Sequence, residues 1–157
     1  VNPENLLISS KTPDKFAELY RTVICTPIIG TFLYNIMVNK KTIEKDFRLD
    51  YYYDQNKITE KDIMYFYEAS QKQHTKGKYL YANINSCFTN TNIIHGLRNI
   101  TQPIYIFTGK ENPENILAAN QYQNYLPDTH IIELEKTKRF PHMERPEDLT
   151  EKLESLN

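Results

Sequence analysis

The chain has 157 residues, 39% of them apolar and 25% charged, which is typical of one soluble globular domain. The formal net charge of -1 creates no strong field, so we expect neither a nucleic-acid partner nor a membrane partner. The two cysteines lack zinc-ligand spacing, which predicts reduced thiols in a cytoplasmic protein, with no metal and no other cofactor.

The first half of the chain is predicted to be helical. Residues 1–9 are expected to form the end of a core strand and a loop, and helices are expected across residues 10–98. The segment TPDKFAELYRTVIC is predicted to begin a helix at Thr12, and Pro27 to end or kink it. The apolar positions of this helix follow i, i+3, i+4 and i+7 spacing and so predict one apolar face, made by Phe16, Leu19, Tyr20 and Val23.

Further helices are expected after Pro27. The segment IIGTFLYNIMV, residues 28–38, is apolar nearly all round, so we expect a helix buried on several sides. KTIEKDFRL predicts a short polar helix. The T-x-x-D spacing of Thr59 and Asp62 is typical of a capping box and predicts the start of a longer helix. GKYLYANINSCF is expected to form one more helix.

From residue 99 the pattern changes to strand, helix, strand, helix. The segments QPIYIFTG and HIIELEK predict two strands, and a strand–helix–strand order indicates a right-handed parallel crossover. Residues 103–108 show no alternation, which is typical of a strand covered on both faces. Two parallel strands cannot cover themselves. The sequence therefore predicts an α/β fold in which this chain supplies the second half of a larger domain.

Three segments resemble the C-terminal third of the α/β-hydrolase fold superfamily. They are IxxPIYIFTG (100–109), NYLPDTHIIELE (124–135) and RFPHMERPED (139–148). The last follows the family pattern G-H-x-P-H-x-E-x-P-E and keeps its later fixed positions: Pro141, His142, Glu144, Pro146 and Glu147. The resemblance implies that residues 1–9 end a core strand, residues 10–98 form a helical cap, and residues 99–157 belong to the C-terminal part of the hydrolase core.

The resemblance also implies a degenerate catalytic triad. Arg139 occupies the position of the family's catalytic histidine, and Asn112 occupies the usual position of its acid. Arginine stays protonated and cannot act as a base, so His142 and Glu111 are the candidate replacements. The family's G-x-S-x-G nucleophile motif does not occur in the 157 residues. Glu144 is expected to hold the loop or to cap the last helix.

The helical segment after Pro27 supplies the candidate substrate-binding residues. In the complete protein its apolar face would roof an acyl-type pocket, and the candidates there are Phe32, Tyr34 and Ile36. The Tyr51–Tyr53 run could line a ligand entrance, although packing is the better interpretation.

Two functional hypotheses follow. In the first, the chain is part of an esterase-like hydrolase of a small apolar substrate and is inactive without the missing N-terminal half of the same protein. In the second, the triad is lost, and the protein binds a small ligand or a protein partner without turnover. A third possibility, a free-standing helical interaction domain, fits poorly with the all-apolar strand at 103–108.

Overall fold

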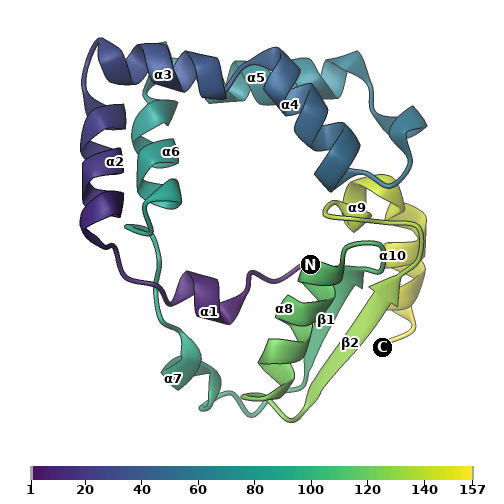
Figure 1. Cartoon of the computed structure of the whole chain (residues 1–157). Helices are drawn as coiled ribbons and strands as arrows, with labels where there is room; N and C mark the ends of the chain where they lie inside the picture. The colour runs from purple at the N-terminus through teal and green to yellow at the C-terminus, as the bar shows by residue number, and fades with distance from the viewer. Residues whose placement is uncertain (1, 157) are drawn as a thin grey trace.

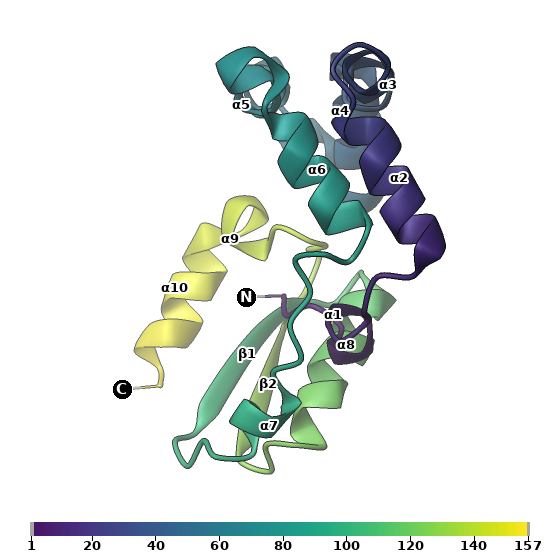
Figure 2. The same cartoon turned by 90° about the vertical axis from the view of Figure 1, so that its left-hand side faces the viewer.

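The computed structural model describes residues 2–156, except for the side chains of residues 73–75. Figure 1 shows a helical part and an α/β part joined into one open frame, and Figure 2 shows the helices α2–α6 above the sheet. The helical part comprises α2 (Lys15–Cys25), α3 (Ile29–Met37), α4 (Lys40–Asp46), the π-helical turn η1 (Phe47–Tyr51), the 3-10 turn η2 (Gln55–Lys57), α5 (Glu60–Thr75) and α6 (Gly77–Asn85). The short helices α1 (Leu6–Ser9) and α7 (Ile94–Leu97) lie beside the α/β part.

The starts of α2 and α5 follow from local capping. Asp14, rather than the expected Thr12, caps α2, because its carboxylate accepts a 2.8 Å hydrogen bond from the Ala17 N–H. The capping box before α5 is confirmed: the Thr59 hydroxyl accepts from the Asp62 N–H at 3.2 Å, and the Asp62 carboxylate accepts from the Thr59 N–H at 3.2 Å. Hence residues close in the sequence define both helix starts, although the cap of α2 lies two residues after the predicted position.

The chain turns sharply between α2 and α3. The two helices are bent by 100°, and Pro27 lies between them as expected. Gly30 permits the close approach, since a Cβ atom there would lie only 2.0 Å from the Ile24 carbonyl oxygen. Among the described residues no single helix is long and apolar enough to cross a membrane. The bent pair of α2 and α3, taken together, has the length and composition that a membrane span needs.

The prediction that residues 28–38 are buried on several sides is wrong. In α3, Gly30 and Tyr34 are buried, whereas Phe32 is 65% exposed. The reason is that α3 meets α2 at Gly30 and α6 at Tyr34, and its other large apolar side chains find no comparable cover. We call the resulting exposed apolar surface of α2 and α3 the corner; it is formed by Phe16, Leu19, Ile28, Ile29, Phe32 and Ile36.

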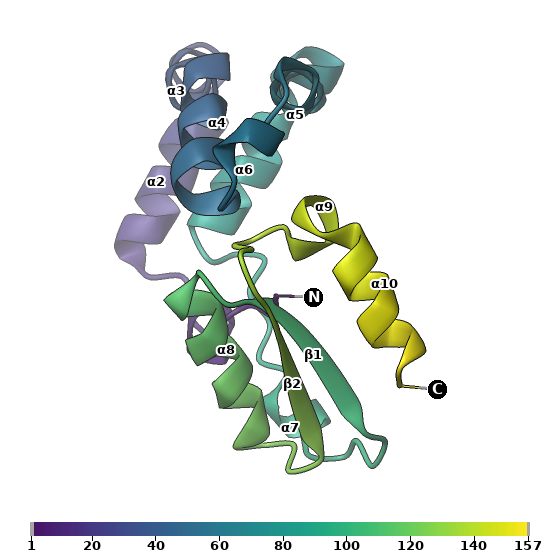
Figure 3. The same cartoon turned by 90° about the vertical axis from the view of Figure 1, so that its right-hand side faces the viewer.

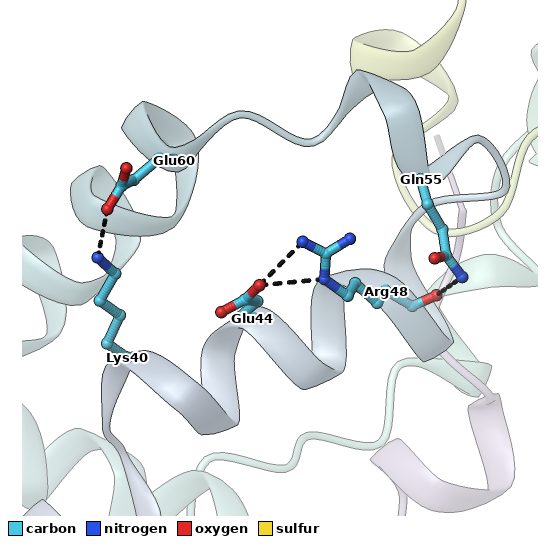
Figure 4. Close-up of polar contacts among 5 residues, drawn as sticks. All are labelled: Lys40, Glu44, Arg48, Gln55 and Glu60. Carbon is cyan, nitrogen blue, oxygen red and sulfur yellow. Dashed lines mark hydrogen bonds and ion pairs between the residues drawn. The ribbon is translucent and has the colours of Figure 1, made fainter.

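Exposed ion pairs connect the middle of the helical part. Figure 4 shows Lys40 of α4 donating to Glu60 of α5 at 2.7 Å, and Arg48 pairing with Glu44 one helical turn earlier at 2.9 Å. The Gln55 amide donates to the Arg48 carbonyl at 3.4 Å. Exposed pairs of this kind contribute about 0–1 kcal/mol each, so packing elsewhere holds these helices in place.

The α/β part has the predicted order. It comprises β1 (Ile104–Gly109), α8 (Pro113–Gln123), β2 (Thr129–Leu134), α9 (Pro141–Glu144) and α10 (Pro146–Glu154). The strands are parallel, in a register running from Ile104 opposite Thr129 to Gly109 opposite Leu134. Helix α8 packs against the sheet, and α10 runs along the other side (Figure 3). The predicted α/β class is therefore confirmed.

The N-terminal segment lies against the α/β part. It was expected to be the end of a strand and a loop, but Leu6–Ser9 form the short helix α1. Leu6 is buried in a small core with Leu97 and Leu126, which fixes α1 beside α8. At the free edge of β1, the Asn2 N–H donates to the Phe107 carbonyl at 2.7 Å. This hydrogen bond places Asn2 beside the carboxyl-terminal half of β1.

A cluster of aromatic rings connects the helical part to the loop after β2. Phe47 is fully buried at its centre, with the Phe66 ring 4.9 Å and the Tyr52 ring 5.5 Å away between centroids. We call this cluster the joint; its rings are Phe47, Tyr51, Tyr52, Phe66 and Phe140. Packing was the better interpretation of the tyrosine run, and Tyr51 and Tyr52 do pack here.

Candidate functional site

A cavity of about 670 Å³ lies beyond the carboxyl ends of β1 and β2. Its walls come from the N-terminal segment, the start of α8 and the loop after β2. Ligands of open α/β sheets bind at this end of the strands. Apolar and charged side chains both line it, the apolar ones being Pro3, Ile8, Leu117, Ala118 and Phe140 and the ionisable ones Glu4, Glu114, Arg139 and His142.

Glu144 fixes the loop that carries the candidate residues. Its side chain is 1% exposed, and its carboxylate accepts 2.7 Å hydrogen bonds from the N–H groups of Tyr53 and Lys138. The Glu144 carbonyl also accepts from the Lys57 ammonium group. One carboxylate therefore ties the loop after β2 to the loop after η1. This matches the expected structural role of Glu144.

Asn2, in the N-terminal segment, holds the same loop by hydrogen bonds of its side chain. Its amide donates to the carbonyls of Lys138 at 3.2 Å and Arg139 at 2.6 Å, and its side-chain oxygen accepts from the Gly109 N–H at 3.0 Å. Its φ of 45° is in the left-handed region, which asparagine tolerates better than most residues. Gly109 must stay small, because a Cβ atom there would lie 2.0 Å from the Lys138 carbonyl oxygen.

Arg139 is held by its backbone, while its side chain reaches the cavity. Its N–H donates to the Tyr51 carbonyl at 3.1 Å, and its guanidinium carbon lies 5.8 Å from the centre of the Tyr51 ring. The guanidinium lies 3.6 Å from a Glu114 oxygen, an ion pair too long for a hydrogen bond. Burial and the nearby Asp46 raise the pKa of Tyr51, and the positive charge of Arg139 opposes that rise.

His142 lines the same cavity as Arg139. It lies in α9, its side chain is exposed, and its ring centroid is 5.9 Å from that of Phe140. Among the described side chains, no carboxylate lies within ion-pair distance of His142. The ring is therefore open to a ligand, and any orienting partner must come from further away.

The structure does not bring Glu111 to His142. Glu111 is exposed and lines a neighbouring cavity of about 510 Å³, which shares Glu114 and Arg139 with the first. The Asn112 side chain caps α8 by accepting from the N–H groups of Glu114 at 3.0 Å and Asn115 at 3.4 Å. The residue at the family's acid position is thus occupied in capping a helix. The sequence did not predict that Glu114 lines the cavity. The only feature that could have indicated it is the position of this acidic residue in the first turn of α8.

The three candidate substrate-binding residues of α3 do not share one face. The Tyr34 hydroxyl donates to the Ser70 carbonyl at 2.8 Å, and its buried ring packs edge-on against Tyr81. Phe32 and Ile36 are exposed on the corner. None of the three lines the cavity at the strand ends. Their role in substrate binding stays a prediction, and Tyr34 has a packing role.

His95 and His130 lie away from the cavity. His95 is exposed in α7, and His130 stacks on Tyr105 with its Nε2 3.3 Å from an Asp128 oxygen. The side chain of His74 is outside the described residues. Among the residues that the structure describes, no group of three histidine, cysteine or acidic side chains could hold a metal ion.

No protein-family model and no curated protein sequence matches the chain. Solved structures do match it. MenH from S. aureus is 12% identical with a TM-score of 0.58, and the match covers 93% of this chain and 54% of that one. Cfl2 from Burkholderia cenocepacia is 11% identical with a TM-score of 0.59, covering 94% and 51% respectively. The epoxide hydrolase CorEH is 14% identical with a TM-score of 0.54, covering 96% and 48%.

All three matched structures have the α/β-hydrolase fold. The chain therefore has part of this fold, as its C-terminal segments predicted, and it spans about half the length of the solved structures it matches. At these identities the likeness concerns the fold alone.

Proposed function

We propose that the chain is the cap and C-terminal part of an α/β-hydrolase-fold protein that acts on esters of a small apolar substrate. The observation that supports this proposal is the cavity at the carboxyl ends of β1 and β2, with His142 on its wall. In the complete protein, an N-terminal half would supply the serine nucleophile and the oxyanion-hole donors. This chain alone, which has no G-x-S-x-G motif, would not turn over an ester.

In this proposal His142 takes the proton of the nucleophile as general base. It is the titratable ring on the cavity wall, whereas Arg139 stays charged and cannot accept a proton. Glu111, the acid first expected to orient the base, lines the neighbouring cavity, and Glu114 is the acid that lies on both cavity walls. We therefore propose Glu114 beside Glu111 as a source of negative charge near the imidazole.

The test uses the chain joined to the residues that its gene encodes before Val1. We expect turnover of p-nitrophenyl esters, and we expect His142→Ala to lower kcat by about 10²–10⁴-fold, the usual contribution of a general base. His95→Ala is the matched control, because His95 is also exposed but lies in α7, away from the cavity. Equal turnover in wild type and His142→Ala would remove the assignment of His142.

A specific observation favours a second function, binding of a small ligand or a protein partner without turnover. Arg139, at the position of the family's base, has its backbone tied to Tyr51 and Asn2 and its side chain paired with Glu114. A protein that binds without turnover would keep ligand affinity while showing no ester cleavage in any variant. An upstream sequence with alanine or glycine at the nucleophile position would decide for this function.

A further inference from the structure

The guanidinium of Arg139 is a charged group with unused hydrogen-bonding capacity. Arginine carries five N–H donors in a fixed fork, and within the described part of the chain the Arg139 side chain makes no hydrogen bond. Its ion-pair partner Glu114 is 3.6 Å away, and the two side chains are 46% and 81% exposed. Such an exposed pair contributes about 0–1 kcal/mol, so a better acceptor can replace it.

The position of Arg139 is fixed, although its donors are free. Hydrogen bonds at both its backbone N–H and its carbonyl hold residue 139 between Tyr51 and Asn2. The Tyr51 ring supports the guanidinium from one side at 5.8 Å. A ligand therefore meets a cation whose backbone is already ordered, which lowers the entropic cost of binding.

The walls next to Arg139 suit an apolar ligand body. Leu117 and Ala118 of α8, Ile8 of α1 and Phe140 after β2 line the same cavity. The other ionisable groups on the walls are Glu4, Glu114 and His142. Each glutamate repels an anion, and this repulsion grows with the charge of the ligand, so a monocarboxylate suits the site better than a dicarboxylate or a phosphate.

We propose that Arg139 binds the carboxylate of an apolar monocarboxylic acid whose hydrocarbon part lies against Leu117, Ala118 and Phe140. The planar fork of arginine matches a carboxylate through two parallel N–H···O bonds. This inference rests on the proposed function in one respect, that the cavity is the ligand pocket. It adds the class of ligand and gives Arg139 a role in binding in place of the catalytic role that its position has lost.

The test compares hexanoate with hexanamide, which have the same hydrocarbon part and differ in charge, by titration calorimetry on the same complete protein that is used in the ester assay. We expect hexanoate to bind about tenfold more tightly, the usual advantage of a charge-assisted hydrogen bond. Arg139→Gln should remove this preference and leave the affinity for hexanamide unchanged. Glu114→Gln should raise the affinity for hexanoate, because it removes the competing carboxylate.

Arg48→Gln is the matched control. Arg48 is also half-exposed and paired with a glutamate, Glu44, but it lies outside the cavity. It should keep the full preference for hexanoate. Equal binding of the two ligands would overturn the role of Arg139 and leave the pocket in place. Binding of neither ligand would overturn the pocket and this inference together. A preference that persists in Arg139→Gln would also overturn the inference, because another group would then bind the anion.

Discussion

The joint and the corner are both rich in large apolar side chains, yet they differ in what covers them. In the joint, Phe47 is fully buried by rings that come from the helical part and from the loop after β2. In the corner, Phe32 is 65% exposed and Ile28 84% exposed, and no element of the described chain covers them. Composition is therefore a poor guide to burial here. What decides it is whether a second segment of the chain reaches the surface in question.

The polar groups of the joint explain why it is closed. Glu144 accepts hydrogen bonds from the N–H groups of Tyr53 and Lys138, which come from different parts of the molecule and lie far apart in the sequence. The two donors are partly buried, and the carboxylate that satisfies both of them belongs to a fully buried residue. The corner contains no comparable bond among its described side chains. The joint is therefore specified by a polar contact as well as by ring packing.

The largest expected effect comes from opening the joint with Glu144→Ala. Two partly buried N–H donors would lose a charged acceptor, and a hydrogen bond to a charged group contributes about 1.5–3 kcal/mol. We therefore expect the free energy of unfolding to fall by about 3–6 kcal/mol. Urea denaturation followed by circular dichroism measures this. Glu151→Ala in α10 removes an exposed carboxylate and should change the stability by less than about 0.5 kcal/mol. Equal stability of the two variants would show that Glu144 does not hold the joint.

A smaller effect is expected in the pH dependence of the joint. Burial, followed by the carboxylates of Asp62 and Glu144, raises the pKa of Tyr52 from 10.0 to about 12. The unfolded chain ionises Tyr52 near its ordinary pKa, so the folded state holds more protons between these two values. The stabilising contribution is complete below pH 10 and is lost as the pH rises towards 12.

We therefore expect the free energy of unfolding to fall with rising pH above about 10. Tyr52→Phe should reduce the slope of this fall, by at most the amount that corresponds to a difference of about one bound proton between the folded and unfolded states. Tyr20, whose pKa burial and Tyr81 also raise to about 12, retains part of the fall in the variant. Urea titrations at several alkaline pH values measure the slope. Tyr65→Phe, at an exposed position, controls for the loss of a hydroxyl group alone. A slope identical to that of wild type would contradict the assignment.

The sequence predicted the elements because their signals are local. Both strands, the break at Pro27 and the capping box at Thr59 depend on neighbouring residues, and the structure has all of them. Helix α1 was missed because its four residues carry no periodicity. It depends on distant contacts, such as the 2.9 Å hydrogen bond from the Leu6 N–H to the Gln121 side chain.

The candidate site was predicted less well for the same reason. The sequence placed Arg139 and His142 on the loop after the second strand, and both line one cavity. The role of Asn2, which binds this loop from the other end of the chain, could not be predicted. Its contacts lie 136 and 137 residues away in the sequence, and no local pattern indicates contacts at such a distance. Asn112 occupies the position where the resemblance places the family's acid. In the structure its side chain caps the start of α8 instead.

The smallest effect on stability is expected in the corner. Phe32→Gln combined with Ile36→Gln replaces two exposed side chains one helical turn apart, so the free energy of unfolding should change by less than about 0.5 kcal/mol. The same exchange at the joint, Phe47→Gln, places a polar group at a fully buried position and should cost more than about 3 kcal/mol. Since exposed apolar patches promote association, the double variant should remain monomeric by light scattering at concentrations where wild type associates. If it were destabilised as strongly as Phe47→Gln, the corner would be covered in solution, and its difference from the joint would disappear.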